Sequence, residues 1–362
     1  MVPIQPTFNL KYFNFFKNNI ENNFHESFFL SWEDALWHLL HIHKIKKDEY
    51  VLVPSFFCWD VVKNMNDHGL KHLVYEVDKF MQPDTEDFVN KIKRFKPKVV
   101  VIFHSVGMKN PLFDMKKVWL KYIDNESILI EDCVHKVLNP NKIIFISKNH
   151  YLIDSLRKVV PIQGSRLFSN HKITRVTLDK VIKTFWYRNS IIFWWILMQL
   201  SLVTLSLTKK ITIQKYVNLF SEYAMKKGYD IIGDHKLSSV GSPIMKYLST
   251  HINYNSIYRS KEFQVRIYLE FFKKKIINNS NFFLFPVDEK DYKQLRGYPI
   301  GIELNYSDQF LSKIRSKGLL FRFELNDSLW SKKFKVIYLP MGPHLSNEQI
   351  YTVCDKINMA IR

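Results

Sequence analysis

Five consecutive apolar residues, Val99–Phe103, restrict the possible folds of this chain more than any other segment. An uninterrupted apolar run of this length is typical of a strand buried on both faces, as in parallel sheets covered by helices. Further strand-like runs, separated by segments long enough for helices, occupy Tyr50–Pro54 and residues 73–77, 127–130 and 143–147. This alternation predicts crossover connections and a mainly parallel sheet, and therefore an α/β fold.

Helices are predicted between and after these strands. Ser31 is a typical helix-capping residue, and the apolar residues that follow it, up to Leu40, recur at helical spacing. In chain order, the other predicted elements are helices at 55–69, 177–228 and 253–275, strands at 301–304 and 336–339, and a last helix that begins near Ser346.

Two domains are predicted, because 362 residues exceed the usual size of one domain. A polar bend that contains Gly241 and Pro243 follows the long helical segment. We therefore place the boundary near residue 240, with a large α/β domain at 1–240 and a smaller α+β domain at 241–362.

The net charge of +19 does not by itself identify a partner. A charge of this size can indicate binding to nucleic acid or to an anionic membrane. The basic residues are spread along the chain, without zinc-finger spacing or an aromatic RNA-binding signature. We therefore expect no nucleic-acid partner. An attraction for anionic substrates, such as nucleotide-linked sugars, fits the charge equally well.

Cysteine usage and the N-terminal residues favour a cytoplasmic location. Cys58, Cys133 and Cys354 are odd in number and far apart, which predicts neither a disulfide framework nor a metal site. The first six residues lack the basic and then apolar pattern of a signal peptide.

Residues 189–208 contain no charged side chain and are as long as a helix that crosses a bilayer. Gln199, Ser201 and Thr204 interrupt the apolar sequence. We prefer a helix that is buried or lies at a subunit interface. The alternative is peripheral membrane contact, with the helix lying in the membrane surface and Trp194 and Trp195 as anchors.

Asp132 and Lys158 are candidates for chemistry. Ligands of parallel sheets bind at the carboxyl ends of the strands, where Asp132 lies, and Lys158 gains its weight from its spacing from Asp132. Asp132 ends an apolar strand, and a carboxylate buried there needs a partner such as a protonated heterocycle. The alternative for Asp132 is an ordinary cap of the next helix. Lys158 stands between Ser155-Leu156-Arg157 and an apolar run, and an amine held among apolar groups can form a Schiff base. Ser155 and Arg157 could bind a phosphate.

The order of these segments resembles the DegT/DnrJ/StrS family of aminotransferases, which depend on pyridoxal 5′-phosphate (PLP). Residues 31–36 occupy the place of the family's phosphate loop, and residues 51–58 the place of its strand and turn. Residues 69–78, 100–107 and 130–135 resemble three further strand segments, the last containing Glu131-Asp132 and His135. Residues 155–158, followed by Gly164-Ser165, resemble the lysine segment. The C-terminal third is similar more loosely, at 255–266 and 339–346.

The resemblance implies the PLP-dependent transferase fold (aspartate-aminotransferase-like, fold type I) and a role for each matching residue. Lys158 would hold PLP covalently and move protons, and Asp132 would pair with the pyridine nitrogen. His135 would lie near the phenolic oxygen and Ser155 near the phosphate. A homodimer is implied as well. His135 alone would be read as a core histidine, and His104 is kept as a structural residue at a strand end.

Five positions depart from the family pattern, one of them Phe57, which replaces a threonine in the turn. Trp32 replaces a glycine and Glu33 a hydroxyl or basic residue in the phosphate loop, and a carboxylate that faces a phosphate is unfavourable. Cys58 stands where an aromatic residue stacks on the cofactor ring, so Phe56 or Trp59 would have to substitute. Gly164-Ser165 replaces a Gly-Gly pair.

The sequence therefore predicts a PLP-dependent aminotransferase that acts on a nucleotide-linked keto-sugar, with an amino acid as donor, in surface-polysaccharide synthesis. The alternative is a catalytically degenerate protein of the same fold that serves as a binding or membrane-associated subunit. Glu33, Cys58 and the uncharged 189–208 segment motivate that alternative.

Overall fold

The computed structural model describes residues 2–16, 24–174, 181–208, 211–233, 239–276, 279–319 and 321–361. Its centre is a seven-stranded sheet with the order β1-β7-β6-β5-β4-β2-β3. The strands are β1 (His25–Phe29), β2 (Tyr50–Pro54), β3 (Lys71–Tyr75), β4 (Val99–Phe103), β5 (Ile128–Asp132), β6 (His150–Ile153) and β7 (Ser165–Ser169). The five strands β3, β2, β4, β5 and β6 run parallel to one another. Strand β7 is antiparallel to β6, and β1 is antiparallel to β7. The predicted mainly parallel sheet is confirmed.

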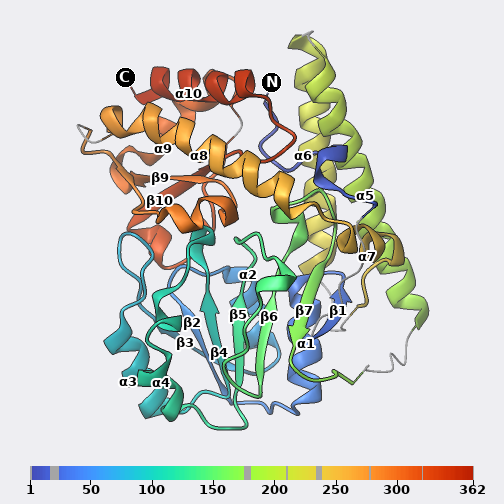
Figure 1. Ribbon diagram of the computed structural model, residues 1–362, viewed down its shortest axis with the longest axis vertical. Helices are drawn as coiled ribbons and strands as arrows, with labels where there is room; N and C mark the ends of the chain where they lie inside the picture. Colours follow the sequence, from blue (N-terminus) through green and yellow to red (C-terminus); the bar gives the residue numbers. More distant parts are fainter. Residues whose placement is uncertain are drawn as a thin grey trace.

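Helices cover both faces of this sheet (Figure 1). On one face, α1 (Trp32–Ile42) and α2 (Trp59–Asp67) pack on the odd-numbered β4 residues Val99, Val101 and Phe103. On the other face, α3 (Thr85–Phe95) and Trp119 at the end of α4 (Lys116–Trp119) pack on Val100 and Ile102. Because side chains alternate along a strand, β4 is buried on both faces, which explains its uninterrupted apolar sequence.

A smaller unit lies over the carboxyl ends of the large sheet (Figure 1). Its antiparallel sheet has the order β10-β9-β8. In chain order it contains α8 (Tyr254–Ile276), β8 (Phe282–Leu284), β9 (Tyr298–Glu303), α9 (Leu304–Ser316), β10 (Phe334–Leu339) and α10 (Asn347–Ile361). The two sheets lie on either side of residue 240, and the exact domain boundary stays a prediction.

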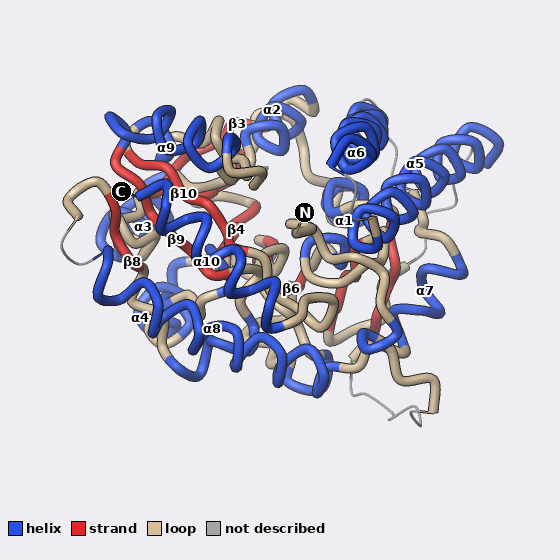
Figure 2. The backbone as a smooth tube through the Cα atoms, turned by 90° about the horizontal axis from the view of Figure 1, so that it is seen from above, coloured by secondary structure: helices blue, strands red, loops and turns tan. Residues whose placement is uncertain are grey.

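Two long antiparallel helices, α5 (Val181–Leu207) and α6 (Ile211–Gly233), run along one side of the molecule (Figures 1 and 2). They replace the single helical segment predicted at 177–228, of which 177–180 lie outside the described residues. The short helix α7 (Pro243–Thr250) follows. Only 33% of the most apolar part of α5, Phe185–Leu205, is buried, so the prediction of a buried helix holds for one face only.

The strand predicted at 143–147 is wrong. Those residues form no strand, and Ile144 is 72% exposed, while the strand itself begins at His150. The edge strand β1 and its neighbour β7 were not predicted, because five residues of mixed polarity give little periodic signal.

Candidate active site

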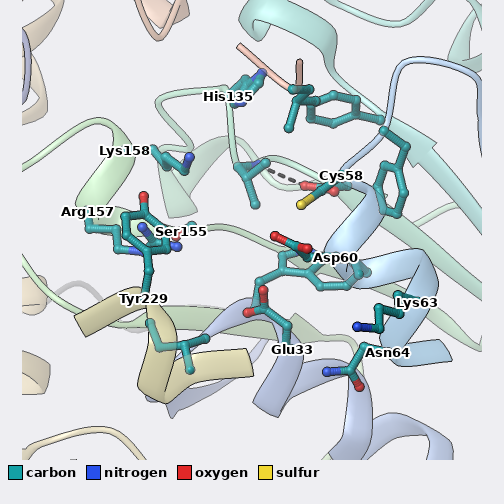
Figure 3. Close-up of a pocket in the computed structure, with 18 of the residues that line it drawn as sticks. Glu33, Cys58, Asp60, Lys63, Asn64, His135, Ser155, Arg157, Lys158 and Tyr229 are labelled. Carbon is teal, nitrogen blue, oxygen red and sulfur yellow. Dashed lines mark hydrogen bonds between the residues drawn. The ribbon is translucent and has the colours of Figure 1, made fainter. Parts of the chain in front are cut away.

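A cavity of about 550 Å3 opens between the carboxyl ends of the strands, α1, α2 and the C-terminal part of α6 (Figure 3). This volume is in the range of small-molecule sites. All seven predicted site residues line it, namely Trp32, Glu33, Cys58, Asp132, His135, Ser155 and Lys158. The fold thus brings together residues that are up to 126 positions apart (Lys158 minus Trp32).

Asp132 ends β5 at the floor of the cavity and is only 3% exposed. Its Oδ1 accepts a hydrogen bond from the Val134 backbone N–H at 2.9 Å. Among the described residues it forms no ion pair, and burial raises the pKa of the carboxyl group to about 8. A buried acid without a cation is energetically unfavourable. A protonated ring nitrogen in the cavity would supply the missing cation.

Lys158 ends the 3-10 turn Leu156–Lys158, which connects β6 to β7. Its side chain points into the cavity (Figure 3). Within the described part of the chain, its Nζ has neither a hydrogen bond nor an ion pair, and burial lowers the pKa of the amine. A lysine without a partner and with a lowered pKa is suited to covalent attachment of an aldehyde.

One end of the cavity has the features of an anion site. Ser155 and Arg157 lie there across from Glu33 in the first turn of α1 (Figure 3). The positive end of the helix dipole favours negative charge at this turn, although the Asp34 N–H already donates to the Ser31 hydroxyl at 3.1 Å. The Ser31 hydroxyl is not available, because it donates to the Asp34 carboxylate at 2.6 Å. Glu33 points into the same space. The site therefore combines anion-binding groups with one carboxylate that opposes them.

Tyr229 closes this end of the cavity from α6 (Figure 3). The Arg157 guanidinium lies 4.4 Å from the centre of its ring. Desolvation of the phenol would raise its pKa, but Arg157 and Lys158 lower it to about 7, and 38% of Tyr229 remains exposed. Tyr229 is thus a group that can gain or lose a proton beside Lys158 near neutral pH.

His135 lines the cavity, but its two ring nitrogens face the small unit. Nε2 accepts a hydrogen bond from Arg296 at 2.8 Å, because a guanidinium can only donate. Nδ1 lies 3.2 Å from the Tyr338 hydroxyl, and burial together with Arg296 lowers the pKa of the ring well below its usual value. Arg296 is paired with Glu324 at 2.8 Å. His135 is therefore a neutral residue that connects the cavity to an ion pair of the small unit.

The aromatic wall of the cavity differs from the prediction. Trp32, Phe57 and Phe103 line it, whereas Phe56 and Trp59 do not. The substitutes suggested for Cys58 are thus wrong, because Phe56 packs inward on Trp330 and Trp59 is 37% exposed. Burial raises the pKa of the Cys58 thiol to about 12, so it remains protonated.

The neighbouring acid Glu131 points to the opposite face of the sheet. Its carboxylate lies 2.7 Å from His104 Nε2 and 3.4 Å from His150 Nε2. Burial opposes ionisation, but these two histidines hold the pKa of Glu131 low. His104 is thus held by Glu131 and does not line the cavity, and its structural role stays a prediction.

Sequence reasoning missed the contributions of distant segments. Tyr229, Asp60 and Lys63 line the cavity, and Arg296 contacts His135. Tyr229 follows Lys158 by 71 residues, and no motif links the two. Only the packing of α6 beside the cavity reveals the contact.

Comparison with known proteins supports the fold. No protein-family model and no curated protein sequence matches the chain. Solved structures do match over 92–93% of it. PseC of Helicobacter pylori, an aminotransferase involved in the biosynthesis of pseudoaminic acid, has 12% identity and a TM-score of 0.58, with 86% of its chain covered.

Two further structures are similar. NtdA of Bacillus subtilis, solved with bound cofactor PMP, has 11% identity and a TM-score of 0.54, with 73% of its chain covered. A DegT/DnrJ/EryC1/StrS aminotransferase of Brucella abortus has 15% identity and a TM-score of 0.50, with 85% covered. The predicted fold, that of PLP-dependent aminotransferases, is thus confirmed. The similar structures include a member of the family that the sequence resembles.

Proposed function

We propose that this chain is a PLP-dependent aminotransferase. The observation that carries the proposal is that one cavity contains a buried carboxylate without an ion pair and a lysine amine without a hydrogen bond or ion pair, as far as the described residues show. These are Asp132 and Lys158, which stand at the ends of adjacent segments in the order typical of the fold. The structural similarity to aminotransferases supports the proposal independently.

The residues present fit the parts of PLP. Asp132 would hold the pyridine nitrogen in its protonated form, which keeps the ring an electron sink for carbanion chemistry. Ser155, Arg157 and the first N–H groups of α1 would hold the phosphate. Trp32 and Phe57 supply the apolar wall around the ring. His135 would orient Arg296 rather than exchange protons, because it is neutral and both of its nitrogens are engaged.

Lys158 would provide the mobile proton. Because burial lowers the pKa of its amine, Nζ gives up its proton more readily than an exposed lysine does. Tyr229, with a pKa of about 7, can hold a proton beside it. Helix α6 lines one side of the cavity, and Lys158 also borders a smaller pocket lined by Arg296 and Glu324.

The finer parts of the proposal concern substrate and setting. A nucleotide-linked keto-sugar as acceptor and an amino acid as donor agree with the net charge of +19, which attracts anionic substrates. A role in surface-polysaccharide synthesis, a homodimer and a cytoplasmic location complete the proposal. PseC, which has the same fold, is an aminotransferase involved in the biosynthesis of pseudoaminic acid.

A catalytically degenerate protein is the second candidate, and Glu33 favours it. Glu33 points into the end of the cavity that would hold the phosphate, where a carboxylate repels an anion. The two candidates differ in one measurable property, the occupancy of the cavity by PLP.

Absorbance spectroscopy tests the proposal. Purified protein mixed with PLP is expected to show a visible Schiff-base band that Lys158→Ala abolishes and that Lys148→Ala, a substitution of an exposed lysine, leaves unchanged. Formation of 2-oxo acid from a panel of amino acids then tests transamination. Absence of the band in the wild-type protein would refute the enzyme proposal and favour the degenerate candidate.

A further inference from the structure

Helix α5 presents a continuous apolar face to solvent. Most of its exposed apolar side chains are separated by three, four or seven residues. They are Phe185, Trp186, Phe193, Ile196, Leu200 and Leu207. Trp186 is 70% exposed and Leu200 59%. This spacing places them on one side of the helix. Exposed apolar patches of this extent mark interaction surfaces in soluble proteins.

The face continues onto α6. Phe193 contacts Trp194 at 5.5 Å between ring centres, and Trp194 contacts Tyr223 of α6 at 5.7 Å. Further exposed apolar residues of α6 are Ile213, Tyr216, Leu219 and Phe220. We call these exposed residues of α5 and α6, with Tyr223, the hairpin face.

Basic groups border the hairpin face, and acidic ones are scarce. Arg188 lies 5.6 Å from the centre of the Phe185 ring, and Lys227 lies 5.6 Å from that of Tyr223. From residue 180 to Gly233, at the end of α6, the sequence has eight lysines and arginines, at 180, 183, 188, 209, 210, 215, 226 and 227, and two acidic residues, Glu222 and Asp230. Aromatic residues next to lysine and arginine are characteristic of helices that lie at a membrane surface.

The opposite side of α5 is fixed to the protein. Ile191, Leu202 and Leu205 are buried there. The buried Gln199 accepts a hydrogen bond from the Phe8 backbone N–H at 2.9 Å and donates to the Pro6 carbonyl at 3.0 Å. Lipid therefore cannot surround α5, although its length and composition would allow it to cross a bilayer.

We propose that the hairpin face binds the surface of a bilayer that contains anionic phospholipid. The apolar side chains enter the boundary between headgroups and acyl chains, and the bordering basic residues contact the lipid phosphates. A second copy of the chain fits less well, because a symmetric contact through this face would bring Arg188 and Lys227 toward basic residues of the same face. Since α6 also carries Tyr229, bound lipid lies beside one wall of the cavity.

Vesicle flotation tests this proposal. The full-length protein is expected to float with vesicles of phosphatidylcholine and phosphatidylglycerol, and far less with phosphatidylcholine alone. Raising the salt from about 0.1 M to about 1 M shortens the screening length from about 10 Å to about 3 Å and is expected to weaken binding. The triple variant Trp186→Ser, Phe193→Ser, Leu200→Ser removes three exposed apolar side chains and is expected to lower the partition coefficient by roughly tenfold or more.

The matched control is Val118→Ser, Ile144→Ser, Met359→Ser, which removes three exposed apolar side chains from other elements and is expected to bind as the wild type does. Circular dichroism shows whether each variant is folded. Equal flotation of the two variants would overturn the proposal, as would wild-type protein that ignores anionic vesicles. Light scattering that shows a dimer in the wild type and a monomer in the hairpin variant, without flotation of either, would assign the face to a second copy instead.

Discussion

Replacing Asp132 by asparagine is expected to stabilise the cofactor-free protein at neutral and alkaline pH. The pKa of Asp132 is about 8 in the folded chain and 3.8 in the unfolded chain. Between these values the folded state binds the proton and the unfolded state does not, so stability falls as the pH rises. Asparagine has no charge to bury, and its Oδ1 can keep the hydrogen bond from the Val134 N–H.

The size of the effect follows from the shift. The interval from 3.8 to about 8 spans about four pH units. At about 1.4 kcal/mol per unit, the ionised carboxylate costs the fold up to about 6 kcal/mol above pH 8. Between about pH 5 and about pH 8 the free energy of unfolding of the wild type should therefore fall by up to about 4 kcal/mol relative to that of Asp132→Asn.

Urea unfolding of both cofactor-free proteins across this pH range measures the difference. Added PLP supplies the control and should reverse the order, because the wild-type carboxylate can then pair with a protonated ring nitrogen while asparagine cannot. Parallel pH profiles of the two cofactor-free proteins would refute the assignment of Asp132 as a buried acid without a partner. Equal stabilisation of both by PLP would refute its proposed role.

Three other substitutions test separate parts of the structure. In ultraviolet difference spectra, Tyr229→Phe should remove the signal of a phenol that titrates near pH 7. Tyr247→Phe, which replaces an exposed tyrosine of α7, should leave that signal unchanged. Asp154→Asn breaks the buried ion pair between Asp154 and Arg166, whose charged atoms lie 2.6 Å apart. Measured by urea unfolding, it should lower the free energy of unfolding by about 3–5 kcal/mol, and a loss below about 1 kcal/mol would contradict this. Glu33→Gln should tighten PLP binding by roughly tenfold in fluorescence titration, because it removes a charge that repels the phosphate, and unchanged affinity would place the phosphate elsewhere.

The sequence predicted the parts of the site that lie at strand ends. Asp132 could be placed because it ends a buried strand, where ligands of parallel sheets bind. Lys158 was placed by its order after Asp132 and by the resemblance of residues 155–158 to the family's lysine segment. The strands β2 and β4 were predicted with their observed bounds, since their apolar runs are uninterrupted.

The remaining features depend on tertiary packing. Tyr229 reaches the cavity only through the position of α6, and Arg296 only through the small unit above the sheet. The composition of α5 indicated an apolar helix. It could not show which side of the helix the N-terminal segment covers through its hydrogen bonds to Gln199. The strand misplaced at 143–147 has the composition of a strand, yet Ile144 is exposed, because the next sheet position is taken by His150–Ile153.

Reduction of the protein–PLP mixture with borohydride, followed by peptide mass spectrometry, tests the central claim most directly. Reduction makes a lysine–cofactor bond permanent, so the modified lysine can be identified. We expect one phosphopyridoxyl group per chain, on Lys158, whose amine faces the cavity without a partner among the described residues. An unlabelled Lys158, or label spread equally over exposed lysines such as Lys148, would contradict the proposed active site.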